Sequence, residues 1–300
     1  MPFYSYDDVL RVSQLIQDMP CEVSEELRGW HWREPPLLPT YNVKINASDL
    51  SFGCKTGRLA FLRHHVRAAE AIPEGLRFGK LVHRVIADAT TTAKAILYCS
   101  KPTSGIDFYE RFIDYLPMVV NVNGLSDDYV NAVNAIWRQA ALAYSSALDK
   151  VVTLSKYLRL DGIVSRVVPW ICEFPIDGRL LGLSRAIRLD ALIPPALIIE
   201  FKTRRPCRDF EITLAGYVLC FECQFKIPVN HAVLLYMEFS NDKRSFKVYE
   251  NILRIDDALR MEFVERRDLY ASKASSGVDP GIPEDCDPFC PYLGVCRSGD

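Results

Sequence analysis

Residues Leu189–Thr203 read LDALIPPALIIEFKT. Two runs of branched apolar residues flank a Pro-Pro dipeptide, and this pattern predicts two strands joined by a tight turn. The second run is too apolar to alternate, which indicates a central strand buried on both faces. Because side chains alternate along a strand, Glu200 and Lys202 should share one face. Asp190 ends the first strand and could sit beside Glu200.

This arrangement would place two carboxylates and an ammonium group at one end of a sheet, next to an apolar core. Buried charges are costly unless they pair or bind a cation. The oxygen ligands of Asp190 and Glu200 suit Mg²⁺ or Mn²⁺, and Lys202 could steady an attacking water or a developing phosphate charge. The D-x9-E-x-K spacing resembles the core of the PD-(D/E)xK nuclease superfamily. A plain ion pair between Glu200 and Lys202 is the alternative, because the pattern is short and common.

The composition is that of an ordinary globular protein, with 49% of the 300 residues hydrophobic and 25% charged. A chain of this length can bury a large core, and we expect one domain with a helical elaboration. No apolar run approaches the ~18 residues of a membrane span, and the first residues lack the basic-then-apolar order of a signal peptide. We therefore expect a cytoplasmic protein with no membrane partner.

The net charge of −2 gives no overall attraction to nucleic acid, but the charges are unevenly distributed. Between residues 179 and 208 the chain has seven basic residues, and its only acids there are the two carboxylates named above. A basic strip around a carboxylate pair is what a phosphodiester substrate needs. We therefore predict that Arg204, Arg205 and Arg208 line the path of a DNA backbone, with an ordinary solvated face as the alternative.

The sequence predicts an α/β fold in three parts. Residues 1–165 should be mainly helical and should contribute Cys54 and His83 to the sites. Residues 166–275 should form the nuclease core, a mixed central sheet flanked by helices. Residues 276–300 should form a cysteine-rich tail.

Three local predictions bear on the sites. Ser48 should cap a helix that carries Cys54. A second helix, from about residue 77 to 98, should carry His83. A buried strand at His231–Phe239 should lie parallel to the central strand after a helical crossover.

Three of the ten cysteines fall within eleven residues of the tail, at Cys286, Cys290 and Cys296. Held by neighbouring prolines, they look like thiolate ligands on a wrapped loop, and Cys54 is the best candidate for a fourth. Zinc and an iron–sulfur cluster both accept four thiolates. Cys220 opens a C-x-x-C in an apolar helical run, where we expect core packing.

Several stretches spread over most of the chain form a pattern together. They are LRGWHWREPPL, ASDLSFGCKTGRLAFLR, FGKLVH, LLGLSRAIRLDAL, IIEFKT, LAGYVL and the cysteine tail. In this order they resemble the CRISPR-associated RecB-like exonucleases, the iron–sulfur nucleases of spacer acquisition. The chain is most similar to the longer archaeal, subtype I-A branch of that family.

The resemblance implies a restriction-endonuclease-like fold with an iron–sulfur clasp at the C-terminus. The four cysteines that it implies as cluster ligands are Cys54, Cys286, Cys290 and Cys296. A 4Fe–4S cluster is expected, with 2Fe–2S or zinc as alternatives.

The resemblance also implies roles for residues of the core. By this resemblance, His83, Asp190 and Glu200 would bind Mg²⁺ or Mn²⁺, and Lys202 would be the catalytic lysine. Tyr217 matches the tyrosine of the family's Q-x-x-x-Y motif and is expected to contact DNA. The glutamine of that motif is replaced by Thr213.

These implications favour a metal-dependent exonuclease that trims single-stranded DNA or overhangs before their integration as spacers. Its expected partners are DNA, the CRISPR integrase and other adaptation proteins. One alternative is the nuclease subunit of a DNA-repair helicase–nuclease complex, whose motor would be a separate chain because no Walker motif is visible. The other is a weakly active DNA-binding scaffold of the acquisition complex.

Overall fold

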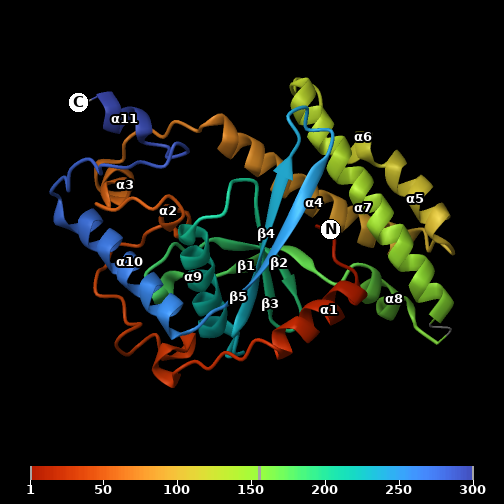
Figure 1. Ribbon diagram of the computed structural model, residues 1–300, viewed down its shortest axis with the longest axis horizontal. Coiled ribbons are helices and arrows are strands. Elements are labelled where there is room, and N and C mark those ends of the chain that lie inside the picture. Colours follow the sequence, from red (N-terminus) through yellow and green to blue (C-terminus); the bar gives the residue numbers. More distant parts are fainter. Residues whose placement is uncertain (1, 155–156, 299–300) are drawn as a thin grey trace.

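A five-stranded mixed sheet lies at the centre of the structure (Figure 1). The computed structural model describes residues 2–154 and 157–298, so five residues of the predicted helical region and tail, 1, 155–156 and 299–300, lie outside it. The strands follow one another across the sheet in their order along the chain. They are β1 (Ile171–Ile176), β2 (Ile187–Ile193), β3 (Leu197–Lys202), β4 (His231–Phe239) and β5 (Phe246–Arg254).

The two strands predicted around the Pro-Pro dipeptide are β2 and β3, which pair antiparallel. β4 runs parallel to β3 after helix α9 (Arg208–Phe225), which confirms the predicted crossover. β3 therefore has a neighbouring strand on each side, as its apolar run predicts. The outer pairs, β1 with β2 and β4 with β5, are antiparallel.

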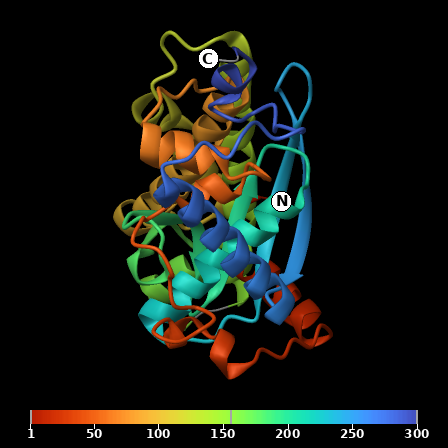
Figure 2. The same ribbon diagram turned by 90° about the vertical axis from the view of Figure 1, so that its left-hand side faces the viewer.

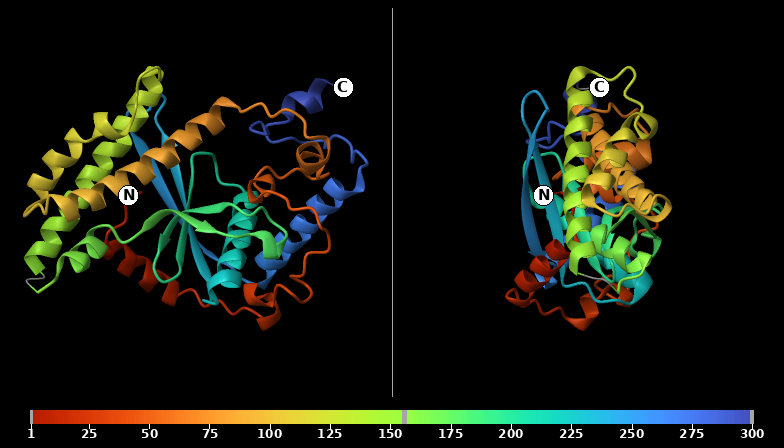
Figure 3. Two further views of the ribbon diagram at one scale, coloured as in Figure 1. Left: turned by 180° about the vertical axis from the view of Figure 1, so that it is seen from behind. Right: turned by 90° about the vertical axis from the view of Figure 1, so that its right-hand side faces the viewer.

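Helices cover both faces of the sheet. α4 (Glu74–Cys99) and α7 (Asp127–Leu154) share a hydrophobic core with one face, and α9 and α10 (Asp257–Ser276) share a second core with the other. Figure 2 shows α9 and α10 in front of the sheet, and Figure 3 shows α4 and α7 from behind. The shorter α-helices beside them are α1 (Tyr6–Gln17), α5 (Gly105–Asp114), α6 (Leu116–Val119) and α8 (Leu160–Val167). No described helix is both long enough and apolar enough to cross a membrane.

The side chains of β3 alternate between these two layers. Ile199 and Phe201 belong to the core shared with α4 and α7, whereas Ile198 belongs to the core shared with α9. Glu200 and Lys202 have the parity of Ile198, so they lie on the α9 face of the strand. This alternation confirms the predicted separation of Phe201 from the two charged residues.

The predicted helix running from Ser48 through Cys54 is wrong, whereas α4 confirms the predicted helix at 77–98. α2 (Ala47–Leu50) is a single turn, after which the chain bends at Gly53 and Gly57, with φ values of +56° and +74°. Glycine adopts such angles readily, and they interrupt a right-handed helix. Cys54 therefore lies in a loop.

The C-terminal tail folds back onto this loop, and Figure 2 shows the two segments together at one end of the molecule. α3 (Arg58–Ala60) and the following π-helical turn (Phe61–Val66) share a small apolar core with the tail helix α11 (Leu293–Ser298). An ion pair of 2.8 Å between Arg58 and Asp279 adds to this contact. The tail is thereby joined to an internal segment near residue 60, about 230 residues earlier in the chain.

A buried ionic network ties α9 to α10, and its central pair, Glu222 with Arg260, is fully buried. Glu222 accepts hydrogen bonds from two nitrogens of Arg260, at 2.7 and 2.9 Å, and from Arg28 at 3.0 Å. The backbone N–H groups of Gly29 and Val229 also donate to this carboxylate, each at 2.9 Å. Loss of its negative charge would leave the Arg260 guanidinium buried without a counter-charge.

Glu222→Gln should therefore lower the free energy of unfolding by about 3–5 kcal/mol. Chemical denaturation measures this as a lower midpoint. The matched control is Glu262→Gln, which removes a partly exposed partner of Arg208 and should change the free energy by less than about 1 kcal/mol. Equal effects of the two substitutions would contradict the assigned role of Glu222.

Candidate active site

The ladder between β2 and β3 ends at the pair Ala191–Ile199, and beyond it two carboxylates bridge the strands. The Asp190 N–H donates to Glu200 Oε1 at 3.2 Å, and the Phe201 N–H donates to Asp190 Oδ2 at 2.8 Å. The side chains thus satisfy backbone groups that would otherwise need partners in the opposite strand. Asp190 and Glu200 are fixed side by side where β2 and β3 separate.

His83 and Lys202 extend this network. His83, on α4, has its Nδ1 atom 2.8 Å from Asp190 Oδ1. Lys202 Nζ donates to Glu200 Oε2 at 3.1 Å. The structure therefore brings together the four predicted residues of the core site from α4, β2 and β3.

The two carboxylates differ in their electrostatics. Burial disfavours the charged form of Asp190, but the charge and hydrogen bond of His83, with the charge of Lys202, outweigh it and lower the pKa of Asp190 to about 2. For Glu200, burial and the negative charge of Asp190 raise the pKa well above its ordinary value, although Lys202 opposes this. Glu200 is only 3% exposed, so a nearby cation would stabilise the pair.

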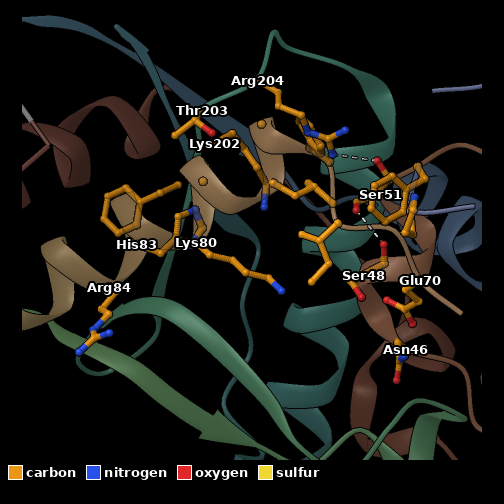
Figure 4. Close-up of a pocket in the computed structure, with 18 of the residues that line it drawn as sticks. Asn46, Ser48, Ser51, Glu70, Lys80, His83, Arg84, Lys202, Thr203 and Arg204 are labelled. Atoms are coloured by element: carbon orange, nitrogen blue, oxygen red, sulfur yellow. Dashed lines mark hydrogen bonds between the residues drawn. The ribbon is translucent and has the colours of Figure 1, made fainter. Parts of the chain in front are cut away.

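A cavity of about 720 Å³ opens in front of this network (Figure 4). His83 and Lys202 line it, and Asp190 and Glu200, which are hydrogen-bonded to them, lie behind. Figure 4 shows the amino groups of Lys80 and Lys202 directed into the same space. A substrate in this cavity would therefore meet ammonium groups from α4 and from β3.

Lys80 and Arg84 are lining residues that the sequence patterns do not single out. Lys80 is exposed and makes no ion pair with another described residue, and Arg84 lies 3.6 Å from Asp88. The available signal was helical spacing, because residues three or four apart are neighbours on a helix surface. Lys80 lies three residues before His83 and four before Arg84.

Glu173 of β1 also lines the cavity and was not predicted, and the other acids of the described lining are Glu70 and Asp88. Glu173 lies between the β1 partners of Ala191 and Leu189, so it is across from Asp190, and its φ is +54°. A positive φ strains a residue that has a side chain, and such residues are frequent at functional sites. Partial burial and then the charge of Asp190 raise the pKa of Glu173. No local sequence pattern places Glu173 at the site, because its position depends on how β1 pairs with β2.

The four predicted cysteine ligands line one small cavity between the Cys54 loop and the tail. They are Cys54, Cys286, Cys290 and Cys296. The Leu59 N–H donates to Cys54 Sγ at 3.5 Å, and Arg58 Nη1 donates to Cys296 Sγ at 3.3 Å. Burial raises the pKa of Cys286, and it raises that of Cys290 to about 11. Thiolates here would need a compensating positive charge.

Donor chemistry decides which group each site fits. Among the residues that the structure describes, no three His, Cys, Asp or Glu side chains are placed so as to coordinate one metal ion, so the fit rests on the types of donor atom and not on a formed coordination sphere. Four sulfurs around one cavity fit a thiolate-bound metal or iron–sulfur cluster. Two carboxylates beside an imidazole fit Mg²⁺ or Mn²⁺, for which oxygen ligands are preferred.

A match to the family described as "CRISPR-associated exonuclease Csa1" covers residues 3–299. The chain belongs to the Csa1 family. A protein of that description from Saccharolobus solfataricus is 33% identical over 296 residues, or 98% of this chain and 99% of the relative. One from Thermoproteus tenax is 26% identical over 292 residues, or 97% of each chain. No solved structure matches this Csa1-family chain significantly.

In this Csa1-family chain, Tyr217 lies near the carboxylates. Burial raises the pKa of Tyr217 well above its ordinary value, and the charges of Glu200 and Asp190 raise it further. Thr213, at the position of the motif glutamine, donates from its hydroxyl to the Asp209 carbonyl at 2.7 Å, within α9. The DNA contact of Tyr217 stays a prediction, and its surroundings favour a role beside the carboxylates.

The three predicted DNA-contacting arginines of this Csa1-family chain have different surroundings. Arg204 lines the cavity and pairs with Asp287 of the tail at 2.7 Å. Arg205 is exposed just beyond it. Arg208 pairs with Glu262 at 2.8 Å and is not part of the cavity lining in the described chain. The structure thus brings Arg204 to the site and leaves Arg208 in a local ion pair.

Proposed function

We propose that this chain is a metal-dependent deoxyribonuclease of the PD-(D/E)xK type, with a restriction-endonuclease-like core, that degrades single-stranded or overhanging DNA from an end. The observation that carries the proposal is one hydrogen-bonded network in which His83 and Lys202 line a cavity with cations in its wall and hold Asp190 and Glu200 behind it. Membership of the CRISPR-associated exonuclease Csa1 family supports the exonuclease activity and the DNA substrate. The proposed task is the trimming of spacer precursors.

The residues that would hold the catalytic metal are His83, Asp190 and Glu200. Support comes from their donor atoms and from the repulsion between the two carboxylates, which a shared cation would relieve. A bound divalent ion supplies an activated water and neutralises charge at the scissile phosphate. The hydrogen bonds from the backbone N–H groups hold both carboxylates in place for this task.

Lys202 is proposed to stabilise the negative charge that develops on the phosphate. Its ammonium group is bonded to Glu200 and lies 5.3 Å from the centre of the Phe210 ring, so both contacts limit its motion. A cation fixed before the reaction stabilises the transition state without reorienting. Lys80 and Arg84 would bind backbone phosphates that flank the scissile one.

A 4Fe–4S cluster on the four cysteines of the tail and the Cys54 loop is the second part of the proposal. Support comes from the cavity that the four thiols share and from the hydrogen bonds that Leu59 and Arg58 donate to two of the sulfurs. None of the four cysteines belongs to the carboxylate network. The proposed role of the cluster is therefore to fasten the tail to the loop.

The proposed partners are DNA, the CRISPR integrase and other adaptation proteins, in the cytoplasm. The support for them is the description of the family and of both relatives as CRISPR-associated.

Linear single-stranded DNA should be degraded in the presence of Mg²⁺ or Mn²⁺, whereas circular single-stranded DNA of the same sequence should survive. An exonuclease needs a free end, so the circle is the matched control. Denaturing gels of DNA labelled at either end report the direction of degradation. Cleavage of the circle would indicate an endonuclease. Binding of the linear DNA without cleavage would favour a scaffold subunit.

A further inference from the structure

A second cavity, of about 540 Å³, adjoins the first at the carboxyl ends of β3 and β4. The two cavities share Gly75, Thr203 and Arg204 in their walls. Arg204 is held in this wall by its ion pair with Asp287 and by three aromatic rings, whose centres lie 4.7–5.4 Å from its guanidinium carbon. A DNA strand leaving the catalytic cavity over this wall would enter the second cavity.

Aromatic side chains make up much of the second cavity. They come from α4, β4, β5 and the tail, and they are Phe78, Tyr236, Phe239, Tyr249 and Phe289. Tyr249 is 51% exposed, and its hydroxyl donates to Glu238 at 3.0 Å. Phe78 packs edge-on against Phe239 with ring centres 5.0 Å apart. The rings are thus held by protein contacts, while the Tyr249 ring remains open to solvent.

Cations outnumber acids around these rings. Arg204, Arg205 and Lys243 line the cavity, and Glu238 is the acid in its described lining. Lys243 Nζ lies 5.3 Å from the centre of the Phe78 ring. Arg205 is exposed and makes no ion pair with another residue in the part of the chain that the structure describes. The cavity therefore combines apolar ring faces with positive charge.

We propose that this second cavity is a stacking subsite for unpaired bases of the DNA strand whose phosphate lies before the catalytic carboxylates. The inference rests on the proposed nuclease function and adds the location of the bases. Aromatic rings bind any base through its π-face, and neighbouring cations bind the phosphates between bases. A base in a duplex is already paired and stacked, so the subsite selects single-stranded DNA or an overhang without reading its sequence.

Fluorescence of 2-aminopurine, a base analogue that is quenched when it stacks, tests the subsite. Single-stranded oligonucleotides with the analogue at successive positions are mixed with the intact protein, without added divalent metal so that the DNA is not degraded. Quenching should be confined to one stretch of neighbouring positions. Tyr249→Leu should remove this quenching and weaken oligonucleotide binding about tenfold, whereas Tyr249→Phe should retain both.

Tyr98→Leu is the matched control for this experiment. Tyr98 is 42% exposed and its hydroxyl donates to Asp161 at 2.9 Å, but it lies outside the lining of both cavities. Unchanged quenching and affinity in Tyr249→Leu would overturn the subsite, whatever the cleavage activity. The nuclease proposal can fail separately. In that case the wild-type protein hydrolyses no DNA when Mg²⁺ or Mn²⁺ is added, although quenching still depends on Tyr249.

Discussion

Glu200→Gln should abolish metal-dependent DNA cleavage, with a fall in rate of at least about a hundredfold to a thousandfold. Glutamine has nearly the shape of glutamate and can still accept the hydrogen bond from the Asp190 N–H. It carries no negative charge, so it binds a divalent cation shared with Asp190 more weakly than glutamate does. The rate is measured on end-labelled single-stranded DNA with saturating Mn²⁺.

The fold should survive this substitution. Burial and Asp190 raise the pKa of Glu200, so ionised Glu200 is unfavourable in the folded protein, and stability is lost as the pH rises through the folded-state pKa. Removing the charge should leave unfolding cooperative, at an unchanged or higher melting temperature near pH 7. The matched control is Glu211→Gln, which loses a partner of Arg208 outside the cavity lining and should cleave DNA normally. Wild-type cleavage activity in Glu200→Gln would contradict the assignment of the active site.

Cys290→Ser should lose most of the iron of the protein and lower its melting temperature by on the order of ten degrees. A cluster joining Cys54 to the tail cysteines closes a loop of about 230 residues, and opening it returns roughly 5 kcal/mol of entropy to the unfolded chain. Iron analysis of anaerobically purified protein and thermal unfolding measure the two effects. Proteolysis of the tail should also become faster.

Cys220→Ser is the matched control for the cluster ligands. Cys220 is buried among apolar side chains of the core shared by α9 and α10 and is outside the cysteine-lined cavity. This variant should retain its iron even if the buried hydroxyl lowers stability. Iron retained in Cys290→Ser and lost in Cys220→Ser would mean that the wrong cysteines are assigned.

The centre of the fold was predictable because strand periodicity is a local property. The apolar run before Glu200 predicted the central strand, and the period of two separated Phe201 from Glu200 and Lys202. The crossover to β4 followed from two buried strands on either side of a helical pattern. In these segments each residue's neighbours in the sequence are enough to fix its face.

The rest of the site depends on contacts between residues that are far apart in the sequence, and a local sequence pattern cannot predict such contacts. Glu173 meets Asp190 through the register of β1 against β2, and Lys80 faces Lys202 through the docking of α4. The apolar spacing around Cys54 predicts a helix, but the chain forms a loop there because Gly53 and Gly57 adopt positive φ. The spacing of apolar residues gives no information about the φ angles of these two glycines.

Titration with Mn²⁺, followed by the electron paramagnetic resonance of the unbound ion, tests most directly whether His83, Asp190 and Glu200 form a metal site. The wild-type protein should take up about one equivalent of Mn²⁺ at its tightest site, and Glu200→Gln should bind at least about tenfold more weakly. Glu211→Gln should bind as the wild type does. Unchanged Mn²⁺ affinity in Glu200→Gln would contradict the metal site at the centre of this account.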